Sequence, residues 1–201
     1  QTNWRRTAAD VPRPSRTRKE VFLMKVTRPL EPEPRFRAPC GVFCPTCFLY
    51  MGNHDDPARL PHASVVLGVP EEDLRYEGCG SPRTAARCAS CAVRRCAEER
   101  GVDSCADCPE FPCSLLRDAQ EKSPQLREAE ASLHVRRKQG FSGWFLRTQE
   151  EFRCPHCGTL NSVYDLWCRS CGASPSCPFA ARNGEEALAF WKNRPSDFPR
   201  P

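Results

Sequence analysis

The chain has 201 residues, of which 15 are cysteine and 20 are proline, and its formal net charge is +5. Apolar residues make up 39%, and without the cysteines that share falls to roughly 31%, below what a self-sufficient hydrophobic core usually needs. We therefore expect the cysteines to stabilise the fold, either as disulfides or as metal ligands.

The sequence contains no apolar stretch of the length of a signal peptide or a membrane span, so we expect a cytoplasmic protein without a membrane partner. Thiols stay reduced in the cytoplasm, and an odd number of cysteines fits poorly with a closed set of disulfides. Metal binding is therefore the favoured use of the cysteines.

The positive charge is concentrated at the N-terminal end. Residues 1–37 carry ten Lys or Arg against four acids, so residues 38–201 sum to −1. Nucleic acid binding needs clustered Lys and Arg against the phosphates, and the remainder of the chain lacks that excess. Each four-thiolate zinc site would add two further negative charges.

Residues 1–37 are rich in Pro and Arg and have no apolar periodicity, which predicts a disordered leader. Lys19-Glu20-Val21 can be encoded by a bacterial ribosome-binding sequence, placed at the spacing of a translation start before Met24. We hypothesise that the native protein begins at Met24 and that residues 1–23 are a translated leader. Without them the net charge falls to +1.

Ten cysteines lie between residues 40 and 113, in the segments CGVFCPTC, CASCAVRRC and CADCPEFPC and at an isolated position between them. Three CxxC pairs among them have the spacing with which two sulfurs bind one ion. Ten thiols suffice for two four-thiolate sites with two left over, but spacing does not assign which pairs share an ion. We predict a metal-binding domain over residues 38–118, with the candidate ligands Cys40, Cys44, Cys47, Cys79, Cys88, Cys91, Cys96, Cys105, Cys108 and Cys113.

Zinc is the favoured metal for this field because of the knuckle-like pairs, and a [4Fe-4S] cluster is the alternative, since CxxC-rich segments also hold such clusters. The CxxxCxxC spacing of CGVFCPTC also occurs in radical S-adenosylmethionine enzymes. The chain after it is too short, and lacks the alternating strands and helices, for their barrel. His54 and His62 are interpreted as solvated loop residues rather than ligands.

Short helices are expected between and after the cysteine segments. The pattern predicts helices over 92–99, 112–121, about 123–138 and 142–152, with Ser123 as an N-cap and Gly140 as a helix end. Residues 119–152 would form a helical connector. A last helix over 185–192 and a Pro-rich tail complete residues 177–201. One aromatic stripe at helical intervals is assigned to the core: Phe141, Trp144, Phe145, Thr148 and Phe152.

Residues 154–172 read CPHCGTLNSVYDLWCRSCG, two CxxC pairs separated by ten residues. Each pair can form a tight turn followed by a glycine, and two such turns supply the four sulfurs of a structural zinc site. We predict a β zinc ribbon over residues 153–176, ligated by Cys154, Cys157, Cys168 and Cys171, and about three zinc ions in the whole chain. Cys177 is interpreted as a spare thiol.

The spacing of this ribbon, with Asn161 between the pairs, resembles general prokaryotic zinc ribbons and also RanBP2-type fingers, some of which bind single-stranded RNA. The acidic flank opposes phosphate, so RNA is the less favoured partner and another protein the favoured one. RNA binding would use aromatic stacking and polar readers, from Phe152, Tyr164, Trp167, Arg153 and Arg169.

Three segments together resemble a bacterial and archaeal family known only as domain of unknown function three-seven-nine-five: CGVFCPTC, CAVRRCAEERGVDSCADCPEFPC and GFSGWFLRTQEEFRCPHCG. The likeness runs from about Pro39 to Gly172. The family often has CxGC where this chain has Tyr76-Glu77-Gly78-Cys79, so a ligand there is either missing or replaced by Cys88. The resemblance implies a cysteine-rich metal-binding fold and no known reaction.

The sequence indicates no catalytic constellation. Its acidic runs, such as Glu71-Glu72-Asp73, are interpreted as solvated, and its four histidines are dispersed. A leftover thiol, Cys79 or Cys177, is the best candidate for chemistry. We therefore expect a small metal-stabilised fold of short helices and irregular segments that acts as a zinc scaffold or protein-interaction module without catalysis of its own. An iron-sulfur redox protein and a single-stranded RNA binder are the alternatives.

Overall fold

The computed structural model of the protein describes residues 29–192. The hypothesised start at Met24, most of the predicted leader and the end of the Pro-rich tail lie outside these residues. Short 3-10 turns occur at Pro34–Phe36, Cys44–Thr46, Glu71–Leu74, Cys105–Asp107 and Pro124–Leu126. The helices of the described part are α2 (Phe48–His54), α3 (Arg59–Leu67), α4 (Ala86–Ala89), α5 (Ala92–Glu99), α6 (Ser114–Glu121), α7 (Ala129–Glu151) and α8 (Pro178–Lys192).

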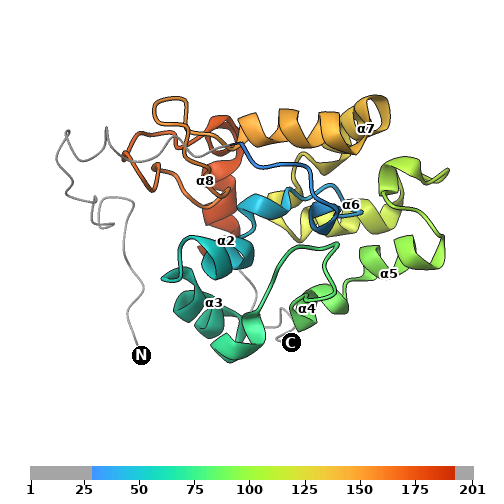
Figure 1. The fold of residues 1–201 in the computed structure, drawn as a ribbon, viewed down its shortest axis with the longest axis horizontal. Helices are drawn as coiled ribbons and strands as arrows, with labels where there is room; N and C mark the ends of the chain where they lie inside the picture. The colour runs from blue at the N-terminus through green and yellow to red at the C-terminus, as the bar shows by residue number, and fades with distance from the viewer. Residues whose placement is uncertain (1–28, 193–201) are drawn as a thin grey trace.

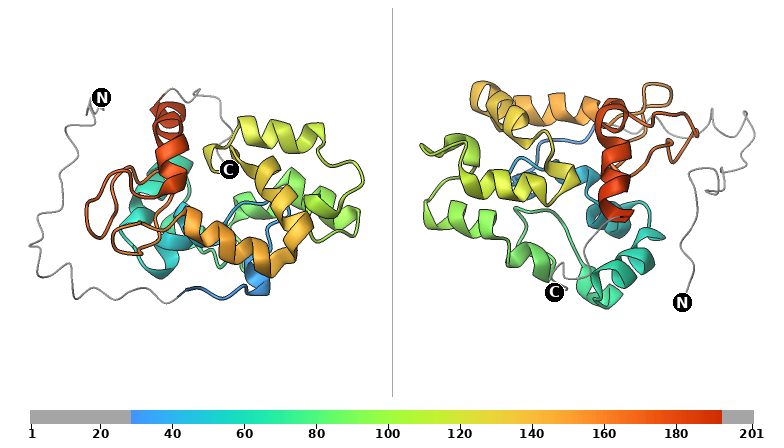
Figure 2. Two further views of the ribbon diagram at one scale, coloured as in Figure 1. Left: turned by 90° about the horizontal axis from the view of Figure 1, so that it is seen from above. Right: turned by 180° about the vertical axis from the view of Figure 1, so that it is seen from behind.

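The helices surround one shared core. Figure 1 shows α7 along the top of the molecule, with α2, α3 and α8 toward one end and α5 and α6 toward the other. The two further views agree with this arrangement (Figure 2). The segment between α7 and α8, which carries the last CxxC pairs, lies beside α8 at the same end as α2 and α3.

Several predicted helices are confirmed. The first spans Ala92–Glu99 and the second spans Ser114–Glu121, with Leu116 fully buried. The expected break at Gly140 is also present, because that residue leaves helical geometry inside α7 with φ 69° and ψ 179°. A glycine tolerates this positive φ without the steric cost that a side chain would bring.

The predicted helix start at Ser123 is wrong. Pro124–Leu126 form a 3-10 turn instead, and the Ser123 side chain makes no capping hydrogen bond. This turn buries Pro124 and Leu126 in the core, and α7 begins only at Ala129. Burial of these two side chains thus outweighs the local preference for a cap.

The placement of His54 and His62 in loops is wrong, because they lie in α2 and α3. The helix α3 accommodates Pro61 because this residue falls in the first turn, where a backbone N–H has no helical partner to lose. The two rings contact aromatic neighbours: His54 stacks on Tyr50 at 4.1 Å between centroids, and His62 meets Phe48 edge to face at 5.9 Å.

The aromatic stripe of α7 is confirmed as core. Trp144 and Phe145 are fully buried, and Phe36 stacks on Phe145 at 5.5 Å between centroids. The buried Trp144 indole donates a hydrogen bond to the Ser132 hydroxyl across the Gly140 kink. The core therefore joins α7 to residues near the start of the described chain.

The predicted β ribbon is wrong in its secondary structure. Within residues 29–192 the structure contains no β-strand, and residues 153–176 contribute one isolated bridge between Arg153 and Leu160. Cys154 N–H to Thr159 O and Asn161 N–H to Phe152 O are the two hydrogen bonds of this bridge, whereas other N–H groups close the turns at the cysteines, such as Gly158 N–H to Cys154 O and Gly172 N–H to Cys168 O. Few remain for a ladder between strands.

A search of the described helices for a membrane span found none with the length and apolar character to cross a bilayer.

Candidate metal centre

The four cysteines of residues 154–172 meet at one point. Their sulfurs all lie within 4.8 Å of one another, with Sγ–Sγ distances of 3.6 Å between Cys154 and Cys171 and 3.5 Å between Cys157 and Cys168. Four sulfurs around a tetrahedral zinc ion, with Zn–S near 2.3 Å, stand about 3.8 Å apart. The arrangement thus fits a single zinc ion, whose four coordination positions would all be filled by cysteine sulfurs.

Each CxxC pair is folded into a turn closed by a glycine. Gly158 N–H donates to Cys154 O at 2.9 Å, and Gly172 N–H donates to Cys168 O at 2.8 Å. The φ angles of the two glycines are 73° and 72°. No atom lies within 4 Å of where a Cβ would stand at either position, so the positive φ rather than crowding explains the glycines.

Asn161 links the two halves of the site from a fully buried position. Its side-chain amide donates to Thr159 O at 2.9 Å and Ser176 O at 3.2 Å and lies 3.7 Å from Cys168 Sγ. Its side-chain oxygen accepts from Arg169 N–H at 3.0 Å. The sequence marked Asn161 only as part of the spacing; its role as a support of the cysteine ligands emerges from these contacts.

The thiols differ in their surroundings. Burial, opposed by nearby backbone N–H groups, raises the pKa of Cys154 well above its usual range. Burial also opposes ionisation of Cys157, but hydrogen bonds from Thr159 outweigh it and, with the neighbouring sulfurs, lower the pKa of Cys157 to about 7. The Thr159 hydroxyl lies 3.3 Å from Cys157 Sγ. One of the four thiols is therefore prepared to bind metal as a thiolate at neutral pH.

A buried ion pair fastens the site to α3. Arg59, which is 7% exposed, donates to both carboxylate oxygens of Asp165 at 3.0 and 3.1 Å and to Asp56 at 2.8 Å. A second pair joins Arg169 to Asp55 at the end of α2. The metal site is thus anchored to helices more than a hundred residues earlier in the chain.

Several of the residues expected to read RNA make contacts within the protein. Phe152 is buried between the rings of Phe43 and Phe179, at 5.6 and 4.6 Å between centroids. Arg153 bonds to Glu150 and to Gly158 O. Tyr164 packs edge to face on Phe48 at 6.5 Å, and Trp167 is half-buried.

Cys177 is buried directly before α8. Its sulfur accepts the Ala180 N–H at 3.4 Å and lies 3.6 Å from the Ser176 hydroxyl. It is not one of the four sulfurs that converge, as expected for a thiol outside the site.

Two of the ten earlier cysteines meet a buried tyrosine. The Tyr76 hydroxyl lies 3.0 Å from Cys79 Sγ and 3.6 Å from Cys44 Sγ, and Cys79 N–H donates to Cys44 Sγ at 3.5 Å. Burial first, and then the two sulfurs, raise the pKa of Tyr76. A neutral hydroxyl therefore stands beside two thiols where the sequence departs from the CxGC pattern.

No other group of three or more metal-ligating side chains converges within 4.8 Å in residues 29–192. The described structure thus supports one four-cysteine metal group and not three zinc ions. The ligand roles predicted for the remaining cysteines stay predictions. Their CxxC pairs do form turns: Cys47 N–H bonds to Cys44 O, Cys91 N–H to Cys88 O, and Cys108 N–H to Cys105 O.

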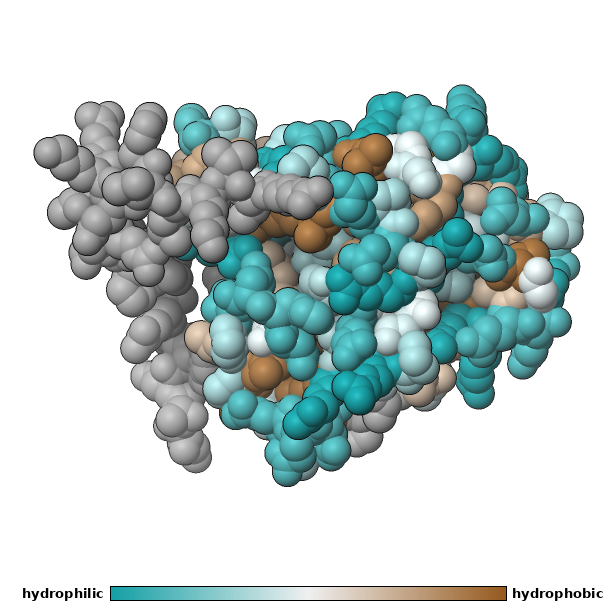
Figure 3. All heavy atoms as spheres, in the orientation of Figure 1, coloured by the Kyte–Doolittle hydropathy of each residue, from teal (hydrophilic) through white to brown (hydrophobic). Residues whose placement is uncertain are grey.

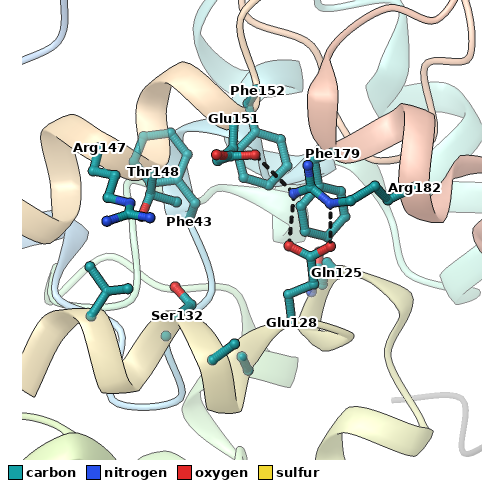
Figure 4. Close-up of a pocket in the computed structure, with 14 residues that line it drawn as sticks. Phe43, Gln125, Glu128, Ser132, Arg147, Thr148, Glu151, Phe152, Phe179 and Arg182 are labelled. Carbon is teal, nitrogen blue, oxygen red and sulfur yellow. Dashed lines mark hydrogen bonds and ion pairs between the residues drawn. The ribbon is translucent and has the colours of Figure 1, made fainter.

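A cavity of about 370 Å³ lies between α7 and α8 (Figure 4). At one side Arg182 donates to Glu128 at 2.8 and 2.9 Å and to Glu151 at 2.8 Å. Figure 4 shows this guanidinium between the two carboxylates, with the Phe179 ring next to it. Asn183 donates a further hydrogen bond to Glu128 at 2.7 Å. These charges satisfy one another and act to hold α8 against α7.

Part of the chain matches a known protein family. Residues 36–118 match the family described as "Protein of unknown function (DUF3795)", so the chain contains a DUF3795 domain, followed by a four-cysteine cluster at residues 154–171. Neither the curated proteins nor the solved structures searched gave a match.

Proposed function

We propose that the protein is a metal-organised scaffold that presents its surface to another protein, with a structural zinc ion at Cys154, Cys157, Cys168 and Cys171. The observation that carries this proposal is the convergence of these four sulfurs within 4.8 Å. Four thiolate ligands leave zinc no position for a substrate or an activated water. The ion therefore stabilises the fold and takes no part in a reaction.

Residues 153–176, the zinc segment of this proposal, are attached to distant parts of the fold, which supports a structural role for them. Its anchors, Arg59 to Asp165 and the rings around Phe152, connect it to α3 and to the core. Loss of the ion would therefore weaken the packing between segments that are far apart in the chain.

Two features of the surface support a protein partner rather than RNA. The face seen in Figure 3 is mostly hydrophilic, with small separate hydrophobic patches. Arg153 and Arg169 pair with Glu150 and Asp55, which leaves less positive charge for phosphates. We expect titration with labelled single-stranded RNA to give no saturable, salt-dependent binding. Saturable binding that weakens steeply with salt would instead favour the RNA reading.

The zinc assignment is tested by Cys154→Ser. We expect this variant to lose about one zinc ion per chain and to unfold residues 153–176 locally, because a structural zinc site contributes on the order of 10 kcal/mol of folding free energy. Elemental analysis and hydrogen exchange measure both effects. Cys177→Ser is the matched control, since it removes another buried sulfur outside the site and should keep the zinc. Retention of all metal by Cys154→Ser would contradict the proposal.

The ten cysteines of residues 40–113 are enough for two further centres, which would bring the total to about three. The metal content of the purified protein tests this number.

A further inference from the structure

The four last cysteines of the DUF3795 domain come together around a cavity between α5 and α6. The cavity has a volume of about 170 Å³ and is lined by Cys96, Cys105, Cys108 and Cys113. Cys96 belongs to α5, Cys105 is the first residue of the turn Cys105–Asp107, Cys108 directly follows that turn, and Cys113 immediately precedes α6. All four thiols are free.

The turn that carries two of these thiols is held firmly. The Ser104 hydroxyl, fully buried, accepts the Ala106 N–H at 3.1 Å. From α7, the Arg137 guanidinium donates to Ala106 O at 2.5 Å and to Cys108 O at 3.2 Å. Cys105 N–H donates to Pro39 O at 3.0 Å. The thiols are thus placed by a fixed backbone, as a preorganised ligand set requires.

These four sulfurs are arranged differently from those of the zinc segment. There the paired sulfurs are 3.5 and 3.6 Å apart, around a point. Here no three of the sulfurs fall within 4.8 Å of one another, and a cavity lies among them. A cubane cluster suits such a space, because each of its irons binds one thiolate and sulfide ions separate the irons.

The surroundings suit a cluster as well. Arg100 places a guanidinium nitrogen 4.0 Å from Cys108 Sγ, and two N–H groups of the same side chain bind Glu110 at 2.9 Å. A positive charge and hydrogen-bond donor beside a ligand sulfur stabilises the reduced, more negative state of a cluster. Apolar side chains complete the cavity wall: Val93, Ala97, Val102, Phe111 and Leu116.

We propose that Cys96, Cys105, Cys108 and Cys113 bind a [4Fe-4S] cluster in this cavity. This reverses the preference for zinc that the spacing alone suggested, because a single zinc ion would draw the sulfurs to a point. The proposal is independent of the zinc ion at residues 154–171, since the two sites share no ligand.

The test uses the full chain, purified without oxygen and reconstituted with ferric iron, sulfide and a thiol that reduces part of the iron to the ferrous state. We expect the wild-type protein to be brown. The double variant Cys105→Ser/Cys108→Ser should contain about four fewer iron ions and about four fewer acid-labile sulfides per chain than the wild type. The same variant should keep the zinc of residues 154–171. Cys154→Ser is the matched control and should show the reverse, losing zinc and keeping iron.

Two results would overturn the proposal: an iron and sulfide content in Cys105→Ser/Cys108→Ser equal to that of the wild type, or a wild-type protein that takes zinc but no iron at these cysteines. If the double variant fails to fold, Arg100→Met decides, since it leaves all ligands in place. We expect it to retain the cluster with a lower reduction potential, and an unchanged potential would place the cluster elsewhere and overturn the assignment.

Discussion

Asn161 supports the geometry of the four-cysteine segment, residues 153–176, from a buried position. It is fully buried and bonds to Thr159, Ser176 and Arg169, next to Cys168. Its neighbours come from both sides of the site, so one amide fixes the register of the two CxxC turns. Supporting residues of this kind are needed to orient ligands as well as to bind them.

We expect Asn161→Ala to lower zinc affinity by roughly 10- to 100-fold and to cost about 1–3 kcal/mol for each buried polar group that loses its partner. Competition with a zinc chelator measures the affinity, and chemical denaturation measures the stability. Asn161→Asp keeps the acceptor for Arg169 N–H but removes the donors, so it should be as damaging. Wild-type affinity in both variants would show that the amide has no supporting role.

Tyr76 lies beside two of the cysteines that the sequence offers as metal ligands. Its hydroxyl contacts the sulfurs of Cys44 and Cys79, at a position that sequence reasoning treated as a missing ligand. Cysteine spacing indicates only which sulfurs could bind an ion, so it does not predict a hydroxyl group beside those thiols.

At the scale of elements, the zinc segment is attached to α3 by the pair of Arg59 and Asp165. The side chains of both residues are largely buried, at 8% and 16% exposed. Removing one partner of a buried pair leaves the other charge uncompensated, which typically costs about 3–5 kcal/mol. The stability of this attachment therefore depends largely on one ion pair.

We expect Asp165→Ala to lower the free energy of unfolding by about 3 kcal/mol, since it leaves Arg59 buried with Asp56 as its remaining partner. Hydrogen exchange should show lost protection in α3 and in residues 153–176, while zinc is retained. Arg83→Ala removes an exposed pair with Glu77 and should change stability by less than about 1 kcal/mol. Equal effects of the two variants would contradict a special role for the buried pair.

The contact between α7 and α8 carries a pH dependence. Hydrogen bonds from Arg182, opposed by burial, lower the pKa of Glu128 in the folded state. Its contribution to stability is therefore present above the unfolded pKa, about 4.3, and is lost as the pH falls through the lower folded pKa. Thermal unfolding of the wild type and Glu128→Gln between pH 3 and 7 measures it, with the variant less stable near neutrality. We expect the difference between them to shrink toward acid, and a constant difference would show that the ion pair contributes nothing.

At the scale of the whole molecule, the DUF3795 domain and the zinc segment share one hydrophobic core. The rings of Phe43, Phe152 and Phe179 form a continuous stack from the first cysteine segment to α8. Parts that share a core in this way are expected to unfold together.

We therefore expect a single denaturant transition, with the helical circular dichroism and the tryptophan fluorescence changing together. Phe152→Ala should shift it by about 3–5 kcal/mol because it leaves a cavity in the stack. Leu146→Ala, at a position that is 47% exposed, is the control and should cost about 0.5 kcal/mol or less. Separate transitions for the two probes would show that the shared core does not couple the parts.

The sequence by itself determined the features that depend on local spacing. Two CxxC pairs with their glycines predict the four-sulfur site, because a tight turn needs only the residues within it. The helix Ala92–Glu99 and the aromatic stripe of α7 follow from periodicity in the same way.

Only the tertiary structure decided what depends on distant partners. The helices α2 and α3 form despite Gly52 and Pro61, because their buried faces and the Arg59 pair stabilise them. Tertiary structure also decides how the ten earlier cysteines are grouped, because CxxC pairs of equal spacing have different surroundings in the fold. A spacing fixes how two sulfurs lie within one turn, but which turns face each other is set by the packing of the helices that carry them.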